Sequence, residues 1–226
     1  MFEKFKQRSR ELERLDTGDY TPAEYRRWQQ EMRFVHRIFG EMRALKNTLF
    51  RDFERSRASS VSILDVGAGS GELLRVLSKW LMNKSAFLVG AELNSDAART
   101  IKSPSIAAIQ CDALDLPFPD SSFDYVFCSL FLHHLDDEPA TDLLKEMKRV
   151  AERRIYVIDL NRHPLAYYFY NIVGRLFLQR FTLEDGSLSI LRSRVPEELI
   201  VLAESAGLSD IKVYHSRANR LVLSGI

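Results

Sequence analysis

One acidic residue and three alternate glycines stand where a short apolar run ends. The run is Val61 to Val66, and the residues of interest are Asp65, Gly67, Gly69 and Gly71. A short apolar run is typical of a buried parallel strand, and apolar residues at helical spacing follow the last glycine. Because glycine has no Cβ, the turn can be tight and a ligand can lie against its backbone. Backbone N–H groups at the helix start face that ligand. The stretch therefore predicts a nucleotide-type pocket.

The glycine spacing distinguishes two kinds of nucleotide ligand. A dinucleotide fingerprint has a glycine at its sixth position, where it lets the helix pack closely on the strand. That position holds Glu72, so the fingerprint fails. The pattern Asp-x-Gly-x-Gly-x-Gly, from Asp65 to Gly71, instead resembles motif I of the class I S-adenosylmethionine-dependent methyltransferases. This ligand has a zwitterionic amino acid end and no pyrophosphate, and an acid helps to orient that end. The plainer alternative is that the glycines only form a turn.

Acidic residues also follow the next two predicted strands. Ligands of open α/β sheets bind beyond the carboxyl ends of the strands, so these positions matter. Glu92 follows residues 86–91, about twenty residues beyond the glycines, where an acid accepts both ribose hydroxyls. Asp112 follows residues 106–110, where a carboxylate accepts a hydrogen bond from an exocyclic amine such as that of adenine. A lone acid at a strand end is more often a helix cap or a solvated loop residue, but three of them at the right strand ends with the glycine turn are hard to explain by chance. The predicted cofactor-binding residues are Asp65, Gly67, Ala68, Gly69, Glu92, Leu93, Asp112, Ala113 and Ser129.

The resemblance to this family covers most of the chain. Val89 to Glu92 is similar to the acidic end of the second strand, and Asp112 to Pro119 is similar to the segment that contacts adenine. Phe123 to Leu135 resembles the fourth strand and following loop of the ubiquinone-biosynthesis-like branch. That branch, as the resemblance implies, methylates small molecules such as quinones, polyketides and lipids. Ile158 to Tyr168, with the long N-terminal helix, resembles methyltransferases found near polyketide synthase genes, a narrower likeness that identifies no substrate.

Three histidines near the predicted strand ends are candidates for acid–base chemistry. Methyl transfer from a sulfonium is an in-line displacement, which an enzyme promotes mainly by holding two atoms in line and excluding water. A phenol or enol acceptor also needs its proton removed, and histidine suits that task. His133, His134 and His163 are the catalytic candidates, with His134 first among them. The alternative is that they cap helices or bind backbone groups. A two-histidine metal site needs a third ligand, and none is evident, so no metal is predicted.

An aromatic block follows the fifth predicted strand. It sits where an insertion, residues 164–195, could roof the pocket, and such a roof would suit an apolar or aromatic acceptor. The alternative is an ordinary packed helix, because some of these residues also form a helical stripe. The predicted substrate-contacting residues are Phe131, Tyr167, Tyr168 and Tyr170.

Residues 58–226 alternate strands and helices, which predicts right-handed β-α-β units and a sheet covered on both faces. Ser95 is expected to cap the helix after the second strand. Residues 211–215 and 220–223 are joined by a short link and are expected to pair antiparallel. This closing pair is similar to the methyltransferase sheet, whose last strand runs antiparallel. The predicted fold is thus α/β and Rossmann-like, with seven mostly parallel strands and an N-terminal helical extension.

Residues 1–57 are predicted to form that extension and to act as a lid. Residues 1–16 are expected to form a short amphipathic helix. Thr21, Pro22 and Glu24 then give a strong start signal for a helix that runs to about residue 56. One apolar stripe of this helix is expected to cover the mouth of the pocket. The stripe consists of Trp28, Met32, Val35, Phe39 and Met42.

Composition excludes several classes of protein. The net charge is +1, so no global field indicates nucleic-acid binding. No Asn-Pro-Pro-Tyr-type motif follows the fourth strand, where enzymes that methylate the amino groups of nucleic acids carry one. Cys111 and Cys128 have neither metal-site spacing nor a disulfide pattern. No apolar run reaches membrane-spanning length and no secretory signal is evident, so a cytoplasmic location is predicted.

The sequence therefore predicts a single methyltransferase domain with a helical lid. It would transfer a methyl group from S-adenosylmethionine to an oxygen or activated carbon of a small apolar acceptor, leaving S-adenosylhomocysteine. The expected partner is a small molecule, with no nucleic acid, and the chain is expected to be a monomer or homodimer. Two alternatives stay open: a protein or nucleic-acid methyltransferase, and a non-catalytic protein that only binds the cofactor.

Overall fold

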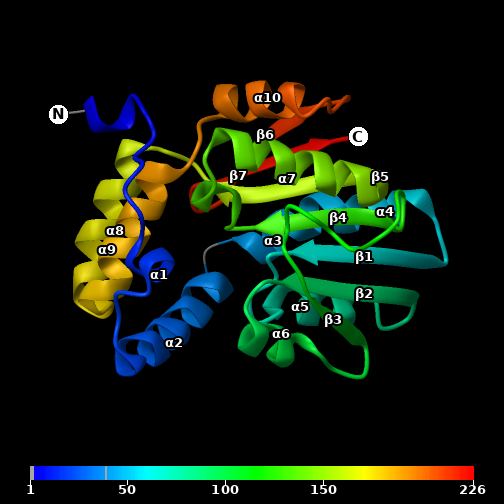
Figure 1. Cartoon of the computed structure of the whole chain (residues 1–226), viewed down its shortest axis with the longest axis horizontal. Helices are drawn as coiled ribbons and strands as arrows, with labels where there is room; N and C mark the ends of the chain where they lie inside the picture. Colours follow the sequence, from blue (N-terminus) through cyan, green and yellow to red (C-terminus); the bar gives the residue numbers. More distant parts are fainter. Residues whose placement is uncertain (1–2, 39) are drawn as a thin grey trace.

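The computed structural model describes residues 3–38 and 40–226, the side chains of residues 33–38 excepted. In this part of the chain, seven strands form one sheet in the order β3-β2-β1-β4-β5-β7-β6 (Figure 1). The strands are β1 (Ser60–Val66), β2 (Ser85–Glu92), β3 (Ile106–Gln110), β4 (Phe123–Ser129), β5 (Ala151–Leu160), β6 (Lys212–Ser216) and β7 (Arg220–Gly225).

Strand direction confirms the predicted mostly parallel sheet. β1 pairs in parallel with both β2 and β4, and the parallel order continues outward to β3 and β5. β7 runs antiparallel to its neighbours β5 and β6, because the link between β6 and β7 is too short for a crossover. The antiparallel last strand expected from the sequence is therefore confirmed.

Helices cover both faces of the sheet. The longer ones are α2 (Pro22–Ile38), α5 (Glu72–Trp80), α6 (Ser95–Ile101), α7 (Asp137–Val150), α8 (Pro164–Phe177), α9 (Arg180–Arg192) and α10 (Pro196–Ser205). The short ones are η1 (Glu3–Phe5), α1 (Arg14–Thr17), α3 (Glu41–Leu45), η2 (Lys46–Phe50), α4 (Arg51–Ser56) and η3 (Leu132–His134).

Two apolar cores lie between these helices and the sheet. Leu143 and Met147 of α7 and Leu199 of α10 belong to one core, with Val126 of β4. The other core joins α3, η2, α4, α5 and α6 to the opposite face of the same strands. One strand contributes to both cores because successive side chains along a strand point to opposite faces of the sheet. The predicted cap of α6 is wrong by one residue, because the Asn94 side chain, and not that of Ser95, accepts the first backbone N–H groups of α6.

The helix predicted for residues 21–56 starts as expected but is not continuous. Thr21 and Glu24 exchange the hydrogen bonds of a capping box. The helix breaks at Gly40, whose φ is +99° and where a Cβ would lie 2.9 Å from the Arg217 carbonyl oxygen. Beyond the break, α3, η2 and α4 pack into a sheet core. The prediction of one helix is therefore wrong. Val35 and Phe39 of the predicted stripe lie outside the residues whose side chains are described.

The N-terminal segment is mostly extended. The short helix predicted for residues 1–16 is wrong, since only η1 and α1 are helical there, and residues 1–2 lie outside the described part. In Figure 1 the arrowheads of β1 and β4 point toward the side where α1, α2 and α9 lie. The N-terminal segment and the α8–α9 pair thus stand beyond the carboxyl edge of the sheet. Whether residues 1–57 act as a lid stays a prediction.

Candidate functional site

The glycine turn lies where strand order reverses, between β1 and β4, which is the expected ligand crevice of such sheets. Gly67, Gly69 and Gly71 all have positive φ, at +69°, +54° and +77°. The backbone N–H groups of Gly67 and Ala68 donate to the Ala91 carbonyl oxygen at 2.9 and 3.1 Å. These bonds tie the turn to the end of β2. Glycine is favoured at these three positions because other residues rarely adopt a positive φ.

Two carboxylates flank this turn. Glu92 accepts the Gly69 N–H at 2.8 Å and the Asn94 N–H at 3.0 Å. Asp65 is buried, and burial together with the negative charge of Glu92 raises the pKa of Asp65 well above its ordinary value. A group that brings positive charge would therefore be favoured beside Asp65.

The loop after β4 closes over the first glycine. Leu130 has φ +51°, an unusual value for a residue other than glycine, and its N–H donates to the Ile158 carbonyl oxygen at 2.8 Å. The chain reverses there and places the Phe131 ring on Gly67, so a Cβ at Gly67 would lie 2.9 Å from that ring. Just before it, the Ser129 hydroxyl oxygen is buried and has no hydrogen-bond partner among the described residues.

The remaining cofactor candidates lie at the ends of β2 and β3. Leu93 is an exposed apolar residue directly after Glu92. Asp112 is exposed and accepts the Leu114 N–H at 2.9 Å, and Ala113 is half-buried beside it. The register pairs Glu92 with Gln110, so both strand ends open on the same edge. The structure therefore brings all the predicted cofactor residues to the carboxyl edge of four neighbouring strands.

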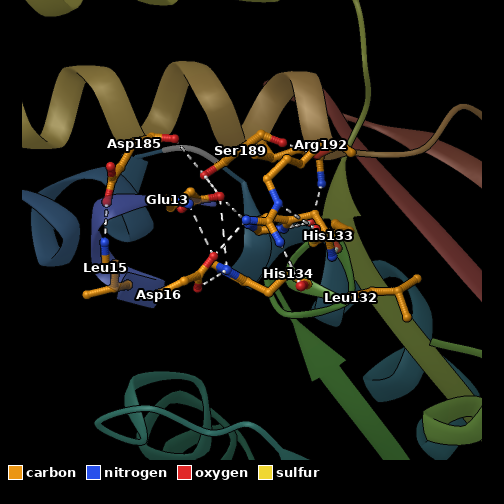
Figure 2. A network of polar contacts seen from close by, with 12 residues as sticks. Glu13, Leu15, Asp16, Leu132, His133, His134, Asp185, Ser189 and Arg192 are labelled. Carbon is orange, nitrogen blue, oxygen red and sulfur yellow. Dashed lines mark hydrogen bonds and ion pairs between the residues drawn. The ribbon is translucent and has the colours of Figure 1, made fainter. Parts of the chain in front are cut away.

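His133 and His134 each bind a carboxylate through Nδ1, and Figure 2 shows His134 beside Asp16. The His133 Nδ1 lies 2.7 Å from Asp159, which also accepts the His133 N–H, and the His134 Nδ1 lies 2.8 Å from Asp16. The centroids of the His133 and His134 rings are 4.2 Å apart. His133 is only 3% exposed, whereas His134 is partly exposed. Burial raises the pKa of Asp159, but the contacts to His133 outweigh burial and hold that pKa below its ordinary value.

Arginines fix the loop that carries these histidines. Arg192, at the end of α9, donates to the His133 and His134 carbonyl oxygens at 3.2 and 2.7 Å and pairs with Asp16 at 2.7 Å. Arg8 and Arg194 bind further carbonyl oxygens of residues 132–135. The orientation of residues 132–135 is therefore set by Arg8 of the N-terminal segment and by Arg192 and Arg194, at and just beyond the C-terminal end of α9.

Glu13 of the N-terminal segment completes the network. Its Oε1 accepts a hydrogen bond from Ser189 at 2.9 Å and lies 3.8 Å from the His133 Nε2. Within the described residues, Glu13, His133 and His134 each place a potential ligand atom within 4.8 Å of the others. The tertiary structure therefore places Glu13 where a third metal ligand would have to lie, which was not evident in the sequence. However, both Nδ1 atoms already bind carboxylates, and Arg192 supplies positive charge at Asp16. That no metal binds stays a prediction.

Sequence comparisons assign this chain to a family. A family model described as a methyltransferase domain matches residues 63–154. The ubiquinone/menaquinone biosynthesis C-methyltransferase UbiE of Burkholderia vietnamiensis is 31% identical over 175 residues, which cover 68% of this chain and 69% of the relative. The chain belongs to the class I S-adenosylmethionine-dependent methyltransferases. The UbiE of Burkholderia thailandensis is similar as well, at 30% identity over the same shares.

Solved methyltransferases share the fold. The magnesium protoporphyrin IX methyltransferase of Synechocystis PCC 6803, with bound S-adenosylhomocysteine, has a TM-score of 0.63 and 15% identity, covering 90% of this chain and 94% of that one. A methyltransferase from Aquifex aeolicus has a TM-score of 0.57 and 16% identity, covering 83% and 89%. These structures confirm the predicted Rossmann-like fold, and membership of the family confirms the predicted cofactor.

The glycine turn of this methyltransferase fits S-adenosylmethionine. A Cβ at Gly69 would meet no atom within 4 Å, so space is open beside the turn backbone. The unpartnered Ser129 hydroxyl can bind a ligand polar group, and the buried Asp65 suits a ligand with positive charge. The cofactor carries an ammonium group and a sulfonium. The open space beside Gly69 and the buried Asp65 carboxylate therefore fit a ligand of this kind.

The other predicted site residues of this methyltransferase take structural positions. His163 is exposed and caps α8, accepting the Leu165 N–H at 3.3 Å. Tyr167 and Tyr168 pack edge-on against Phe5, at 5.5 and 6.1 Å between ring centroids. The Tyr170 hydroxyl donates to the Thr182 carbonyl oxygen at 2.8 Å. Tyr170 therefore joins α8 to α9, which is what the alternative prediction of an ordinary packed helix implies for this residue.

Sequence reasoning missed the residues that surround the histidines. Asp159 ends the fifth strand, and its place at a strand end was a usable signal. Glu13, Asp16 and Arg192 had no local signal, because each lies far along the chain from the histidines it contacts. Only the docking of the N-terminal segment on α9 and η3 brings them together.

Proposed function

We propose that this methyltransferase transfers the methyl group to an oxygen or activated carbon of a small apolar or aromatic acceptor. The observation that carries the proposal is the placement of His134. Its N–H donates to the Phe131 carbonyl oxygen at 3.1 Å, and the Phe131 ring lies on Gly67 of the cofactor turn. The partly exposed His134 is therefore one short turn away from Phe131, whose ring contacts the glycine turn.

The cofactor would be held by the residues at the strand ends. Glu92 would accept the ribose hydroxyls, Asp112 the adenine amine, and Asp65 and Ser129 would orient the amino acid end. Leu93 and Ala113 would pack against the adenine, and Gly67, Ala68 and Gly69 would let the cofactor approach the backbone. Bound S-adenosylmethionine supplies an electrophilic methyl group on a good leaving group. Positioning and the exclusion of water are then the main tasks of the protein.

His134 would remove the acceptor proton through Nε2. Because the Asp16 carboxylate can only accept a hydrogen bond, the His134 Nδ1 carries the proton and Nε2 is left as the base. Arg192 fixes Asp16 in turn, through an ion pair of 2.7 Å. His133 is buried and has Asp159 at Nδ1, so it would support the orientation of His134 and not touch the acceptor. His163 is an exposed helix cap and is left out of this mechanism.

Apolar side chains support an acceptor of the quinone, polyketide or lipid type. Phe131 lies next to the cofactor turn, and Tyr167 and Tyr168 form an aromatic group with Phe5. Relatives whose names describe ubiquinone/menaquinone C-methylation add support for an aromatic acceptor. Tyr170 is left out of the proposed acceptor contacts because its hydroxyl is bound in the contact between α8 and α9.

An acceptor screen tests the proposal. The protein is incubated with S-adenosylmethionine and with alkylated hydroquinones and phenols, unfolded peptides or RNA, and S-adenosylhomocysteine formation is measured. We expect turnover with the hydroquinones and phenols only, and magnetic resonance of the product distinguishes a methyl on oxygen from one on carbon. The control is Gly69→Val, which strains a residue at φ +54° and fills the space beside the turn. Turnover with peptides or RNA alone contradicts the proposal.

A further inference from the structure

The outer face of α8 is apolar and exposed. Four large apolar residues recur along it at steps of four, three and four: Leu165, Phe169, Ile172 and Leu176, with exposed fractions of 74, 60, 68 and 74%. Phe177 lies beside the last of them and is 70% exposed. Residues at these spacings lie on one side of a helix. Large apolar side chains gathered in this way on a surface usually mark a contact with another body.

The fold itself does not use this face. The opposite side of α8 packs on α9, where a Cβ at Gly174 would lie 2.7 Å from Leu183 and where Tyr170 bonds to Thr182. Figure 1 shows α8 and α9 together at the outer edge of the molecule, away from the sheet. The packing of α8 on α9 therefore uses one side of α8, and the exposed apolar residues lie on the other side.

The charges around this face are mainly positive. The chain has no Asp or Glu from residue 160 to residue 183, although Arg175 and Arg180 lie in that stretch. Lys4 lies 3.6 Å above the Tyr167 ring at the other end of α8. The acids near the ends of α8 pair with cations: Glu184 with Arg180 at 2.6 Å, Glu31 with Arg27 at 2.8 Å and Glu3 with Lys6 at 2.7 Å. Tyr167 is two residues from Leu165, so Lys4 and Arg175 lie on a flank of α8 beside the apolar face, and both of these unbalanced charges are positive.

We propose that the outer face of α8 docks on the surface of an anionic phospholipid bilayer. An apolar face with cations at its edge buries its side chains at the lipid boundary and attracts anionic headgroups. A second copy of this chain would bring Lys4 and Arg175 against cations of the same kind, so charge favours lipid over self-association. α8 has 14 residues, too few to cross a bilayer, so it would lie in the plane of the surface.

Among the described residues, every helix is too short or too polar to span a membrane. The inference rests on the surface of α8 and not on the identity of the acceptor. If the acceptor is as apolar as proposed above, it dissolves in the same lipid, and docking would bring the enzyme to it. Arg175, on the flank of the apolar face, would then stand at the lipid boundary.

Cosedimentation with vesicles tests the inference on the full chain. The vesicles contain equal parts of phosphatidylglycerol and phosphatidylcholine, or phosphatidylcholine alone. We expect binding to the anionic vesicles, weaker binding at high salt, and little binding to the neutral ones. The variant Phe169→Gln/Leu176→Gln should bind roughly ten-fold or more weakly, because it removes two large apolar side chains from the face.

Matched controls separate lipid docking from other causes. Met82→Gln/Val201→Gln also removes two exposed apolar residues, but from other elements, and should bind vesicles like the original protein. Arg175→Glu should weaken binding to anionic vesicles only. Equal binding by the α8 variant and the original protein contradicts the inference. If the original protein does not bind vesicles but sediments as a dimer, and the α8 variant is a monomer, the inference is wrong and the face contacts a second copy of the chain.

Discussion

The Glu13 Oε1 lies 3.8 Å from the His133 Nε2, although one residue belongs to the N-terminal segment and the other to the loop after β4. Asp159 binds the Nδ1 of His133, so Nε2 is the ring nitrogen that faces Glu13. Both side chains are buried. Burial raises the pKa of Glu13 to about 7.

The raised pKa of Glu13 predicts a pH-dependent stability. The unfolded chain loses this proton near pH 4.5, whereas the folded chain holds it to about pH 7, so the folded state binds more protons in between. The free energy of unfolding should therefore fall as pH rises through this window, by at most about 3 kcal/mol. Glu13→Gln keeps an acceptor for Ser189 and should reduce that fall, while the raised pKa of Asp65 leaves a remainder. Urea unfolding measured across the window checks the prediction.

The control for this measurement is Glu11→Gln, an exposed acid of the same segment, which should keep the original pH dependence. If Glu13→Gln and the original protein lose stability in parallel as pH rises, Glu13 does not hold its proton in the folded state.

Glu92→Ala should weaken the binding of S-adenosylhomocysteine. The proposed ribose contact is a charged hydrogen bond, whose loss costs roughly 1.5–3 kcal/mol, or roughly ten- to a hundred-fold in affinity. The substitution also frees the Gly69 N–H, which Glu92 binds at 2.8 Å. Calorimetry measures the affinity, and Asp96→Ala, an exposed acid at the same sheet edge, serves as the control. Equal affinities in the two variants would exclude Glu92 from the cofactor site.

His134→Ala should lower turnover by about 10²–10⁴-fold, the usual size of a general-base effect. Affinity for S-adenosylhomocysteine should hardly change, because the base meets only the acceptor. The matched control is His163→Ala, which removes an exposed helix cap and should leave turnover nearly intact. Thermal unfolding is measured in parallel. An activity loss that follows the loss of thermal stability would show that His134 is structural.

Much of the fold follows from local patterns in the sequence. The strand from Val61 to Val66 and the glycine turn after it were predictable, because apolar runs and glycines at positive φ act through their immediate neighbours. The capping box of Thr21 and Glu24 is local in the same way. The break at Gly40 also had a local signal, a glycine inside a helical pattern, and the apolar stripe on both sides of it concealed that signal.

The sequence by itself determined the class of enzyme, the cofactor turn and the acids at the strand ends, because parallel strands bring their carboxyl ends to one edge. The tertiary structure alone decided the surroundings of the histidines. Glu13, Asp16 and Arg192 reach His133 and His134 only after the N-terminal segment docks on α9 and η3. Such contacts depend on loop closure over most of the chain, and no local periodicity records them.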